Sequence, residues 1–532
     1  MTHPTLTDSL PALLPLSDGA VAPRSSEVGG VNVCGLLRTE SGLGAAARGY
    51  IRALKALGTT VSLQNMSNVV ANRAQDSTYT DFGHETAFDV NLVCVNADMH
   101  FSVVAEQGMD FFEGRYNIGV WAWELPRFPA KWFDRFAYYD EIWVGTSFIA
   151  SALAPVSPVP IVRMPTVLTP TVVGSREIGR ARLGVPPDEF VFLFTFDFTS
   201  LVGRKNPMAV VEAFCRAFKP ADEARLVVKS VNASANPEDL EAMRQRAEGS
   251  RVSFIDGYWS AAEVSDLTAA CDCYVSLHRS EGTGLTISDA MALGKPVIAT
   301  GWSGNTDFMN VSNSYPVRYE LVKLSKGVGP YAAGETWAEP SVEHAAELMR
   351  HVFEHREEAA CRGAVAKRDI ETDFSEAAVA ELIRQRFGAI AIRRKLASFR
   401  RGVKAKYFAY QKLLKQFNSA VSRAIPAGST VAVISRGDEK LLQLEGRTAW
   451  HFPQTESGTY AGHYPADGVE AVAQLESLVR RGARFLVIPE TSLWWLEHYA
   501  EFRQHLVTNC RRLRSSRSCM IYELSTRRNN AR

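Results

Sequence analysis

The most regular feature of the sequence is an alternation of short apolar runs with longer amphipathic stretches. Apolar runs typical of buried strands occur in the first part of the chain at 31–37, 61–64, 88–95, 116–121 and 141–144. The stretches between them have apolar residues at a spacing near 3.6 and predict helices. Strands that alternate with helices favour a parallel sheet, and therefore the α/β class.

The alternation continues in two further series. The second series predicts strands at 190–196, 226–231, 252–255, 274–277 and 297–300. The third predicts strands at 431–435, 485–488 and 519–524, with helices at 468–480 and 493–506. Because a single core stops growing near about 250–300 residues, a chain of 532 residues is expected to hold more than one domain.

We therefore predict two α/β domains with parallel sheets and a third, small α/β domain. The proline-punctuated segment 155–170 is typical of a hinge between domains. Helices from Val342 onward are expected to close the second domain and to cross back to the first. The expected parts are a disordered leader at 1–29, a first domain at 30–165, a second domain at 166–385, a basic helical linker at 386–424, an accessory domain of unknown role at 425–525 and a tail at 526–532.

Composition excludes some classes of function. A net charge of +1 argues against a nucleic-acid partner, which needs a broad basic surface. No apolar run reaches the ~18–20 residues that span a bilayer. The start of the chain lacks the basic segment of a signal peptide, and the eight scattered cysteines are typical of small core residues. These features indicate a cytoplasmic protein.

A glycine-rich turn follows the predicted strand 274–277. Gly282 and Gly284 allow a ligand close to the backbone, and the next helix offers its free N–H groups in the same direction. Together they predict an anion site, such as one for a phosphate. Two carboxylates flank the turn, Glu281 at its mouth and Asp289 on the helix.

Two adjacent cations, Arg204 and Lys205, follow the first strand of the second series and precede a helix at 208–218. The helix dipole disfavours positive charge there by ~0.3–1 kcal/mol, and a bound anion would reverse that cost. A solvated turn is the alternative. The position at a strand end, in the same predicted sheet as Glu281, favours phosphate binding.

Two motifs of the first domain leave alternatives open. Gly42 and Gly44 nominally fit a dinucleotide fingerprint, but they lie several residues beyond the strand, and the second strand ends without an acidic residue. A glycine turn that lines an interdomain cleft is favoured over nicotinamide binding, and a purely structural turn stays open. The segment from Trp121 to Glu124 places two indoles and a carboxylate at a strand end, which suits sugar rings or a packed loop equally.

The region 393–415 holds nine Lys or Arg residues and no acidic residue, interleaved with apolar side chains. This pattern predicts a basic amphipathic helix or helix pair. It fits an anionic membrane surface, at ~1 kcal/mol per basic residue, or a solvated linker. In the third domain, the aromatic residues around His451 and His463 fit packing or a ligand face, and the histidine spacing is weak evidence for a metal.

The glycine turn with Glu281 and Asp289 resembles the signature of retaining glycosyltransferases of family four. The resemblance covers about 31–374 and is strongest over 192–218 and 274–307. It implies the GT-B fold, in which two Rossmann-like domains face each other across a cleft, the first on the acceptor side and the second on the side of the nucleotide-sugar donor. The family has a second Glu seven residues after the first, where this chain has the shorter Asp289.

The resemblance also implies roles for individual residues. Glu281 lies beside the donor sugar, and Asp289 contacts the ribose. Amides of the turn and two cations hold the diphosphate, and Gly42 and Gly44 line the acceptor or phosphate loop. The donor-binding residues are then Arg204, Lys205, Gly282, Thr283, Gly284, Leu285 and Asp289. His100 is a candidate for the family's first-domain histidine, and Glu124 is a hypothetical catalytic group that steers or deprotonates the acceptor hydroxyl.

The resemblance implies transfer of a hexose-type sugar from a nucleoside-diphosphate sugar to a glycan or lipid-linked acceptor, with retention of configuration. Polysaccharide or glycolipid biosynthesis at the inner face of a membrane is the expected setting. The sequence has no Asp-x-Asp element for a metal, and no cofactor besides the donor substrate is expected. The alternatives are a catalytically silent sugar-binding module and a nucleotide-sugar epimerase of the same fold.

Overall fold

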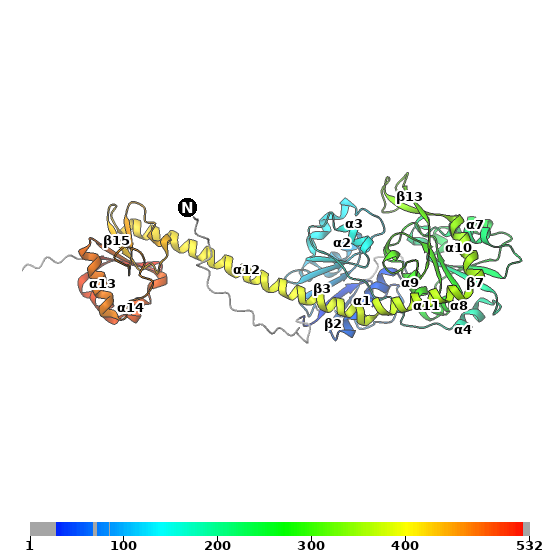
Figure 1. The fold of residues 1–532 in the computed structure, drawn as a ribbon, viewed down its shortest axis with the longest axis horizontal. Helices are drawn as coiled ribbons and strands as arrows, with labels where there is room; N and C mark the ends of the chain where they lie inside the picture. Colours follow the sequence, from blue (N-terminus) through cyan, green and yellow to red (C-terminus); the bar gives the residue numbers. More distant parts are fainter. Residues whose placement is uncertain (1–27, 67–71, 84–85, 525–532) are drawn as a thin grey trace, which may run out of the picture. The chain divides into compact units, whose positions relative to one another are not determined.

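The computed structural model describes residues 28–66, 72–83 and 86–524 (Figure 1). The predicted leader up to residue 27 and the predicted tail lie outside these ranges, as do the side chains at 397–398, 400–401, 403 and 406. The chain divides between Ala391 and Ile392 into two compact units. The first holds two parallel sheets, and the second holds a smaller mixed sheet.

The first sheet has six parallel strands in the order β2-β1-β3-β4-β5-β6. Its strands are β1 (Val31–Gly35), β2 (Val61–Asn65), β3 (Val90–Cys94), β4 (Tyr116–Val120), β5 (Glu141–Val144) and β6 (Ile161–Arg163). The strand order reverses between β1 and β3, which makes their carboxyl ends a ligand-binding position. Strand β6 lies inside the segment interpreted as a hinge. It is a short edge strand without a fully buried residue, so no apolar run marked it.

Helices α1 (Gly42–Ala56), α2 (His100–Gln107) and α3 (Ser147–Leu153) belong to the first domain. The long helix α12 (Glu376–Ala424) begins there as well, because its first turns bury Val379, Ile383 and Phe387 in the core of the first sheet. The Phe387 ring lies 6.2 Å from that of Trp143. The prediction that the late helices cross back to the first domain is confirmed.

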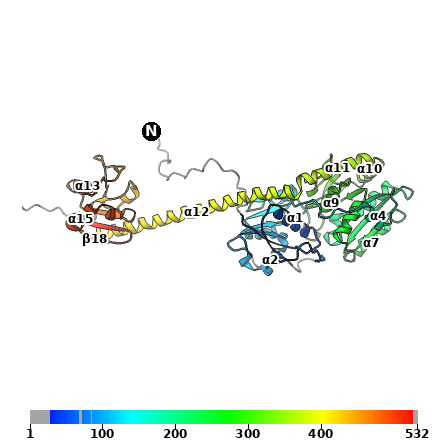
Figure 2. The ribbon, with the colours of Figure 1, turned by 90° about the horizontal axis from the view of Figure 1, so that it is seen from below.

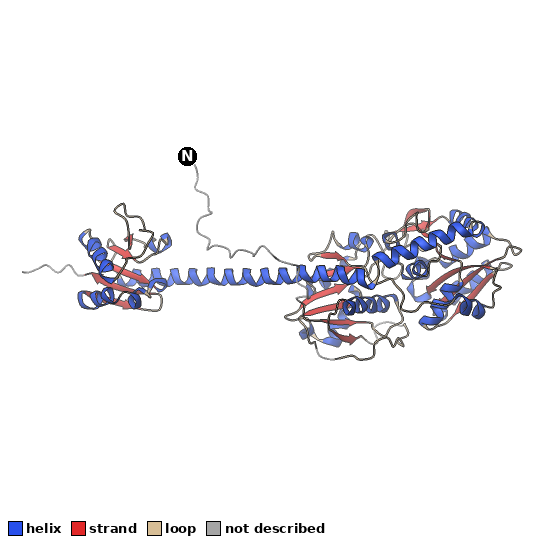
Figure 3. Ribbon diagram, turned by 60° about the horizontal axis from the view of Figure 1, so that its bottom comes forward, coloured by secondary structure: helices blue, strands red, loops and turns tan. Residues whose placement is uncertain are grey.

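The second sheet has the order β12-β11-β10-β7-β8-β9, again parallel. Its strands are β7 (Phe190–Asp197), β8 (Ala224–Val231), β9 (Val252–Asp256), β10 (Cys273–Ser276), β11 (Val297–Thr300) and β12 (Tyr315–Val317). Along β7, Phe192 packs into one core and Leu193 into another, because helices cover both faces of the sheet (Figure 3). The order is that of a Rossmann fold, with its switch point between β7 and β10.

The helices of the second domain are α4 (Arg176–Leu183), α5 (Val202–Lys205), α6 (Pro207–Ala217), α7 (Pro237–Arg246), α8 (Ala261–Ala270), α9 (Leu285–Ala292), α10 (Val342–Glu354) and α11 (Arg356–Asp373). A hairpin of β13 (Tyr319–Lys323) and β14 (Thr336–Pro340) was not predicted. Its Leu324, Tyr331 and Trp337 pack with the aromatic core of the first domain. The hairpin therefore joins the two domains of the first unit.

The second unit holds the third predicted domain. Its sheet has the order β16-β15-β17-β19-β18, formed by β15 (Thr430–Val433), β16 (Thr448–His451), β17 (Phe485–Pro489), β18 (Cys510–Ser515) and β19 (Cys519–Leu524). Helices α13 (Gly468–Arg480), α14 (Trp495–His498) and α15 (Ala500–Asn509) accompany the sheet (Figure 2). Strands β16 and β18 were not predicted. The sequence of β18 lacks an apolar run, because four of its six residues are Arg or Ser.

Two open questions about this region have structural answers. The basic stretch is one helix, since α12 continues without a break to Ala424 and buries Phe417 and Val421 against the third sheet. The aromatic residues of the third domain serve packing first: Trp495 and Phe452 are fully buried, with ring centroids 5.6 Å apart. The α/β fold with two Rossmann-like sheets and a smaller third sheet is confirmed.

Candidate active site

The two segments predicted to hold a diphosphate meet at the switch point of the second sheet. Lys205 follows β7 in the one-turn helix α5, and Glu281 follows β10. The Nζ atom of Lys205 lies 2.5 Å from Oε1 of Glu281, and Nη1 of Arg204 lies 3.2 Å from the same oxygen. Open α/β sheets bind ligands at this position, outside the carboxyl ends of the strands.

The local backbone fixes the two cations differently. Leu201 and Asn206 flank α5 with positive φ values of 62° and 54°. The side-chain amide of Asn206 donates to the carbonyl of Leu277 at 3.0 Å. Arg204 donates to the carbonyls of Ser280 and Ser200 at 2.9 and 3.1 Å. Its side chain is 7% exposed, against 18% for Lys205. Arg204 therefore ties the two loops together, and Lys205 is the cation more open to a ligand.

Glu281 is held as an anion. Burial alone would raise its pKa, but the charges of Lys205 and Arg204 outweigh that effect and lower the pKa to about 2. Its backbone N–H donates to Oγ of Ser303 at 2.9 Å, and its carbonyl accepts from the N–H of Gly304 at 2.9 Å. Both the position and the charge of this carboxylate are thus set by neighbouring loops.

The amides of the glycine turn are free to bind an anion. Among the residues that the structure describes, no protein acceptor receives a hydrogen bond from the backbone N–H groups of 282–285. Gly284, with a φ of 89°, precedes α9 in the left-handed region, where a side chain would be strained. Four adjacent donors at a helix N-terminus, beside Lys205, are a suitable arrangement for an anion such as a phosphate.

Packing against two neighbours keeps the glycine turn in place. The hydroxyl of Thr146, at the start of α3, donates to the carbonyl of Gly282 at 2.8 Å. A Cβ atom on Gly304 would lie only 1.9 Å from the same carbonyl oxygen, so glycine is required at position 304. A Cβ atom on Gly145 would lie 3.3 Å from Oγ1 of Thr283, which places this predicted residue against the first domain as well.

The predicted glycines of the first domain have two different roles. A Cβ atom on Gly42 would meet only the side chain of Leu285, at 3.6 Å, so Gly42 faces the glycine turn across the cleft. A Cβ atom on Gly44 would lie 2.2 Å from the carbonyl oxygen of Thr39, so glycine is required here by the packing of the turn before α1. Ser41 caps α1 by accepting from the N–H of Gly44.

Asp289 lies on α9 with an exposed side chain. The protein that surrounds its carboxylate nevertheless raises its pKa to about 7 by desolvation, with a smaller opposing effect from Arg52 of the first domain. The structure thus places Asp289 on the helix that follows the glycine turn, without a direct partner among the residues it describes.

Glu124 reaches the same site from the first domain. The hydroxyl of Tyr331 donates to Oε2 of Glu124 at 3.0 Å, and the hydroxyl of Ser280 donates to the Glu124 carbonyl. The indoles before it are packed: Trp121 stacks on Phe128 with ring centroids 5.6 Å apart. The packed-loop interpretation therefore holds for Trp121, while the carboxylate at its end contacts the hairpin loop beside Glu281.

His100 is not open to a ligand. Its ring is fully buried next to Phe112 and Tyr138, and Nδ1 lies 2.9 Å from the hydroxyl of Tyr139. Burial lowers its pKa to about 4, so the ring is neutral. This environment is that of a core histidine.

Sequence reasoning missed three residues of the site. Tyr331 belongs to a glycine-rich loop with no apolar pattern, so nothing in the sequence marked it. His278 and Asn305 follow the ends of β10 and β11, and strand ends alone could have indicated them. Nε2 of His278 lies 3.0 Å from Oδ1 of Asn305, and burial lowers the pKa of His278, which favours the neutral ring.

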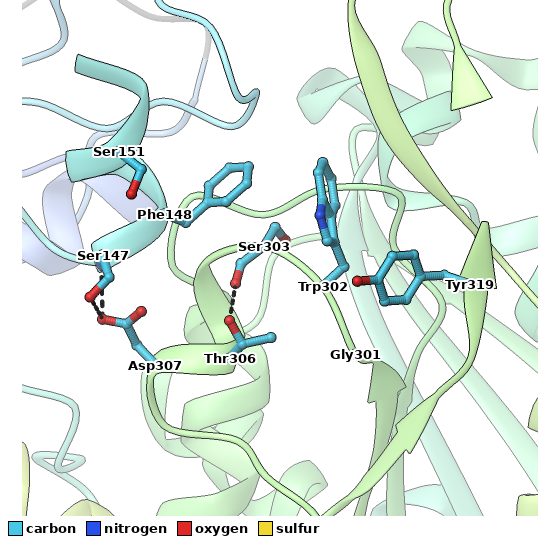
Figure 4. Close-up of a pocket in the computed structure, with 9 residues that line it drawn as sticks. All are labelled: Ser147, Phe148, Ser151, Gly301, Trp302, Ser303, Thr306, Asp307 and Tyr319. Carbon is cyan, nitrogen blue, oxygen red and sulfur yellow. Dashed lines mark hydrogen bonds between the residues drawn. The ribbon is translucent and has the colours of Figure 1, made fainter. Parts of the chain in front are cut away.

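A cavity of about 300 Å³ lies between the two domains of the first unit, and one of its lining residues, Ser303, accepts from the backbone N–H of Glu281 (Figure 4). Asp307 holds its two sides together, since it accepts from the backbone N–H of Ser147 at 2.9 Å and from Arg163 at 2.7 Å. The residues around the cavity are Ser147, Phe148, Ser151, Gly301, Trp302, Ser303, Thr306, Asp307 and Tyr319. Within the described ranges, no group of three or more His, Cys, Asp or Glu residues is arranged to hold a metal ion.

Part of the chain is similar in sequence to known proteins. Residues 190–317 match the family model for glycosyl transferases group 1. A stretch of 122 residues is 31% identical to the alpha-monoglucosyldiacylglycerol synthase of Streptococcus pneumoniae, which amounts to 23% of this chain and 26% of that protein. The chain thus spans about a quarter of the length of this curated relative.

Two solved structures are similar over most of the chain. The sucrose-phosphate synthase of Thermosynechococcus elongatus has a TM-score of 0.51 at 14% identity, over 68% of this chain and 100% of that one. Anabaena HepE in complex with UDP and glucose has a TM-score of 0.48 at 13% identity, over 68% and 99%. At such identities the first likeness establishes the fold alone. The chain has the GT-B fold, and its residues 190–317 are similar to the glycosyl transferases group 1.

Proposed function

We propose that the chain transfers a hexose-type sugar from a nucleoside-diphosphate sugar to a glycan or lipid-linked acceptor, with retention of configuration. The observation that carries this proposal is the contact of Lys205 and Arg204 with Glu281, directly before the four free amides of 282–285. Cations and amide donors at one point suit a diphosphate leaving group. An ionised carboxylate beside them suits the positive charge that develops on the sugar.

In the proposed reaction, the bond between the anomeric carbon and the phosphate oxygen breaks, and its electron pair leaves with the diphosphate. Lys205 and the amides of the turn stabilise that charge, and preorganised donors of this kind contribute about 3–4 kcal/mol each. The acceptor hydroxyl forms the new bond on the face that the diphosphate leaves. Its proton passes to Glu124, which Tyr331 orients.

The direct test is incubation of the full chain with a panel of nucleoside-diphosphate hexoses and a mixture of glycan and glycolipid acceptors. Release of nucleoside diphosphate, together with a product whose anomeric proton coupling matches that of the donor, supports a retaining transferase. Binding without release indicates the silent sugar-binding module. Appearance of the donor's epimer indicates the epimerase.

Asp289 gives a prediction on pH dependence. Its ordinary pKa of 3.8 is raised to about 7, so ionisation in the folded protein becomes complete only above that pH. Under the proposed function the ionised carboxylate accepts from the ribose hydroxyls. Nucleoside-diphosphate affinity is therefore expected to rise about three- to tenfold between about pH 6 and pH 8, the range in which the group titrates. Calorimetric titration at each pH measures this rise.

The Asp289→Asn variant is the control, since its side chain does not titrate. Its affinity should change less than that of the parent over the same range, because only the terminal phosphate of the ligand, with a second pKa of about 6, then titrates. Because the folded-state pKa of Asp289 is raised, its contribution to stability is lost as the pH rises through 7, so the variant should also be more heat-stable than the parent at high pH but not at low pH. Equal pH slopes for both proteins would contradict the ribose role.

We also propose that residues 393–415 of α12 lie on an anionic membrane surface. This segment carries nine basic and no acidic residues, and Leu396, Phe399 and Phe408 are 54%, 63% and 58% exposed. Exposed apolar groups among cations fit anionic lipid better than a second copy of the same cationic helix. In the described part of the chain, no helix is long and apolar enough to cross a membrane.

Vesicle sedimentation tests the membrane surface. The full chain is expected to bind vesicles that contain phosphatidylglycerol, to bind phosphatidylcholine vesicles weakly, and to be released by high salt. Changing Phe399 and Phe408 to serine should weaken binding about tenfold or more, because each change removes apolar area that the lipid would bury. The same change at Val469 and Val507, which are 64% and 71% exposed in the third domain, should have no effect. Binding that does not depend on lipid charge, or that is unchanged when Phe399 and Phe408 are replaced, would contradict this proposal.

A further inference from the structure

We propose that the cavity between α3 and β11 is the subsite for the terminal sugar ring of the acceptor. This inference rests on the proposed function and names a second ligand position beside the diphosphate site. The cavity lies at an interface of the two GT-B domains, with Phe148 contributed by one domain and Trp302 by the other (Figure 4). Its volume of about 300 Å³ is at the lower end of small-molecule sites, which suits one or two sugar rings.

The chemistry of the lining favours a neutral sugar. Trp302 and Phe148 lie edge to face with ring centroids 5.1 Å apart, and Tyr319 is 6.4 Å from Trp302. Aromatic rings suit the apolar C–H face of a pyranose. In the part of the chain that the structure describes, the hydroxyls of Ser151 and Tyr319 have no protein hydrogen-bond partner, so they are available to a sugar's hydroxyl groups.

The charge of the lining argues against a phosphate or a nucleotide in this cavity. Asp307 is the charged residue among its lining residues, and Arg163 neutralises it at 2.7 Å. None of the predicted donor-binding residues, from Arg204 and Lys205 to the glycine turn, lines it. A long acyl chain is disfavoured as well, because serine, threonine and tyrosine hydroxyls surround the space.

Ser303 connects the cavity to the proposed reaction centre. Its Oγ atom accepts from the backbone N–H of Glu281 at 2.9 Å, and the same residue lines the cavity. A sugar seated against Trp302 would thus be separated from the backbone of Glu281 by Ser303. In the proposed arrangement, a hydroxyl group of that sugar extends past Ser303 toward the donor sugar, and the diphosphate stays on Lys205 and the turn.

The test measures binding of two ligand classes to the full chain. Saturation-transfer NMR with methyl glycosides of glucose, galactose, mannose and N-acetylglucosamine probes the cavity, and thermal shift with nucleoside-diphosphate sugars probes the donor site. Ser151→Trp fills the cavity from the first domain, where Ser151 is exposed, and Trp302→Ala removes its ring from the second. Ala154→Trp adds the same indole at an exposed position outside the cavity, and Trp302→Phe keeps an aromatic ring.

We expect at least one methyl glycoside to bind the parent chain and to bind Ser151→Trp and Trp302→Ala about tenfold more weakly. Ala154→Trp and Trp302→Phe should retain binding, and the thermal shift with donor should be unchanged in all four variants. The proposal is overturned if no glycoside binds the parent, if the cavity variants bind it normally, or if they lose the donor shift instead, which would make the cavity a donor site. Failure of the proposed function looks different: no nucleotide sugar would bind or turn over, while glycoside binding would persist.

Discussion

Replacing Glu281 by glutamine will lower the rate of sugar transfer about 100-fold or more while nucleoside-diphosphate binding is retained. The carboxylate is ionised, with a pKa lowered to about 2. At a distance of about 5 Å and an effective dielectric constant of about 20, its charge stabilises a cationic sugar by about 3 kcal/mol, which corresponds to roughly 100-fold in rate. Binding should hold or tighten, because Lys205 and Arg204 lose their internal counter-ion. Single-turnover kinetics and calorimetry separate the two effects.

The matched control is Glu320→Gln, which removes a carboxylate from an exposed position on β13 of the same domain. It should leave both rate and affinity unchanged. The Glu281→Gln variant is also expected to unfold at a lower temperature, because two cations with little exposed surface remain without a full counter-charge. A Glu281→Gln variant with parental turnover, or one that loses binding and rate in equal measure, would contradict the assignment.

Replacing Lys205 by methionine will weaken nucleoside-diphosphate binding about 10- to 100-fold. A hydrogen bond to a charged group contributes ~1.5–3 kcal/mol, and methionine keeps the apolar stem while it removes the charge. Lys205 is expected to bind the diphosphate, whereas the Arg204 guanidinium donates to the carbonyls of Ser280 and Ser200. Titration calorimetry with the preferred nucleoside diphosphate and with its nucleoside measures the phosphate contribution.

Lys219→Met serves as control, since Lys219 is exposed near the end of α6 in the same domain. The nucleoside without phosphates should bind the parent chain and the Lys205 variant equally, because Lys205 acts on the diphosphate alone. Arg204→Met should instead lower the temperature of unfolding, because it removes the contacts that join two loops. Loss of nucleoside affinity in Lys205→Met would show a general disturbance of the site and would contradict a specific contact of Lys205 with the diphosphate.

The sheets were predictable because their strands are buried on both faces. Strands such as β3 and β10 are fully buried and mostly apolar, and such runs can be recognised in a single sequence. The elements that were missed are partly exposed or polar. β6 has no fully buried residue, β18 is rich in arginine, and β13 exposes most of its side chains. Their positions depend on partners far away in the chain, which local pattern does not record.

The candidate site divides in the same way. Lys205 and Glu281 were found because each follows a buried strand, and parallel strands bring their carboxyl ends to one edge. Tyr331 was missed, since it reaches Glu124 from a loop 207 residues later in the chain. The different roles of Arg204 and Lys205 could not be predicted either, because the sequence does not show how deeply each of two adjacent cations is buried.

We propose that Lys205 and the amides of 282–285 bind a diphosphate together. Amide hydrogen exchange measured by mass spectrometry, with and without a panel of nucleoside diphosphates, tests it most directly. We expect at least one nucleoside diphosphate to slow exchange in peptides that cover 200–206 and 281–286, while its nucleoside does not. Protection confined to other segments, or no protection by any nucleoside diphosphate, would rule out this diphosphate site.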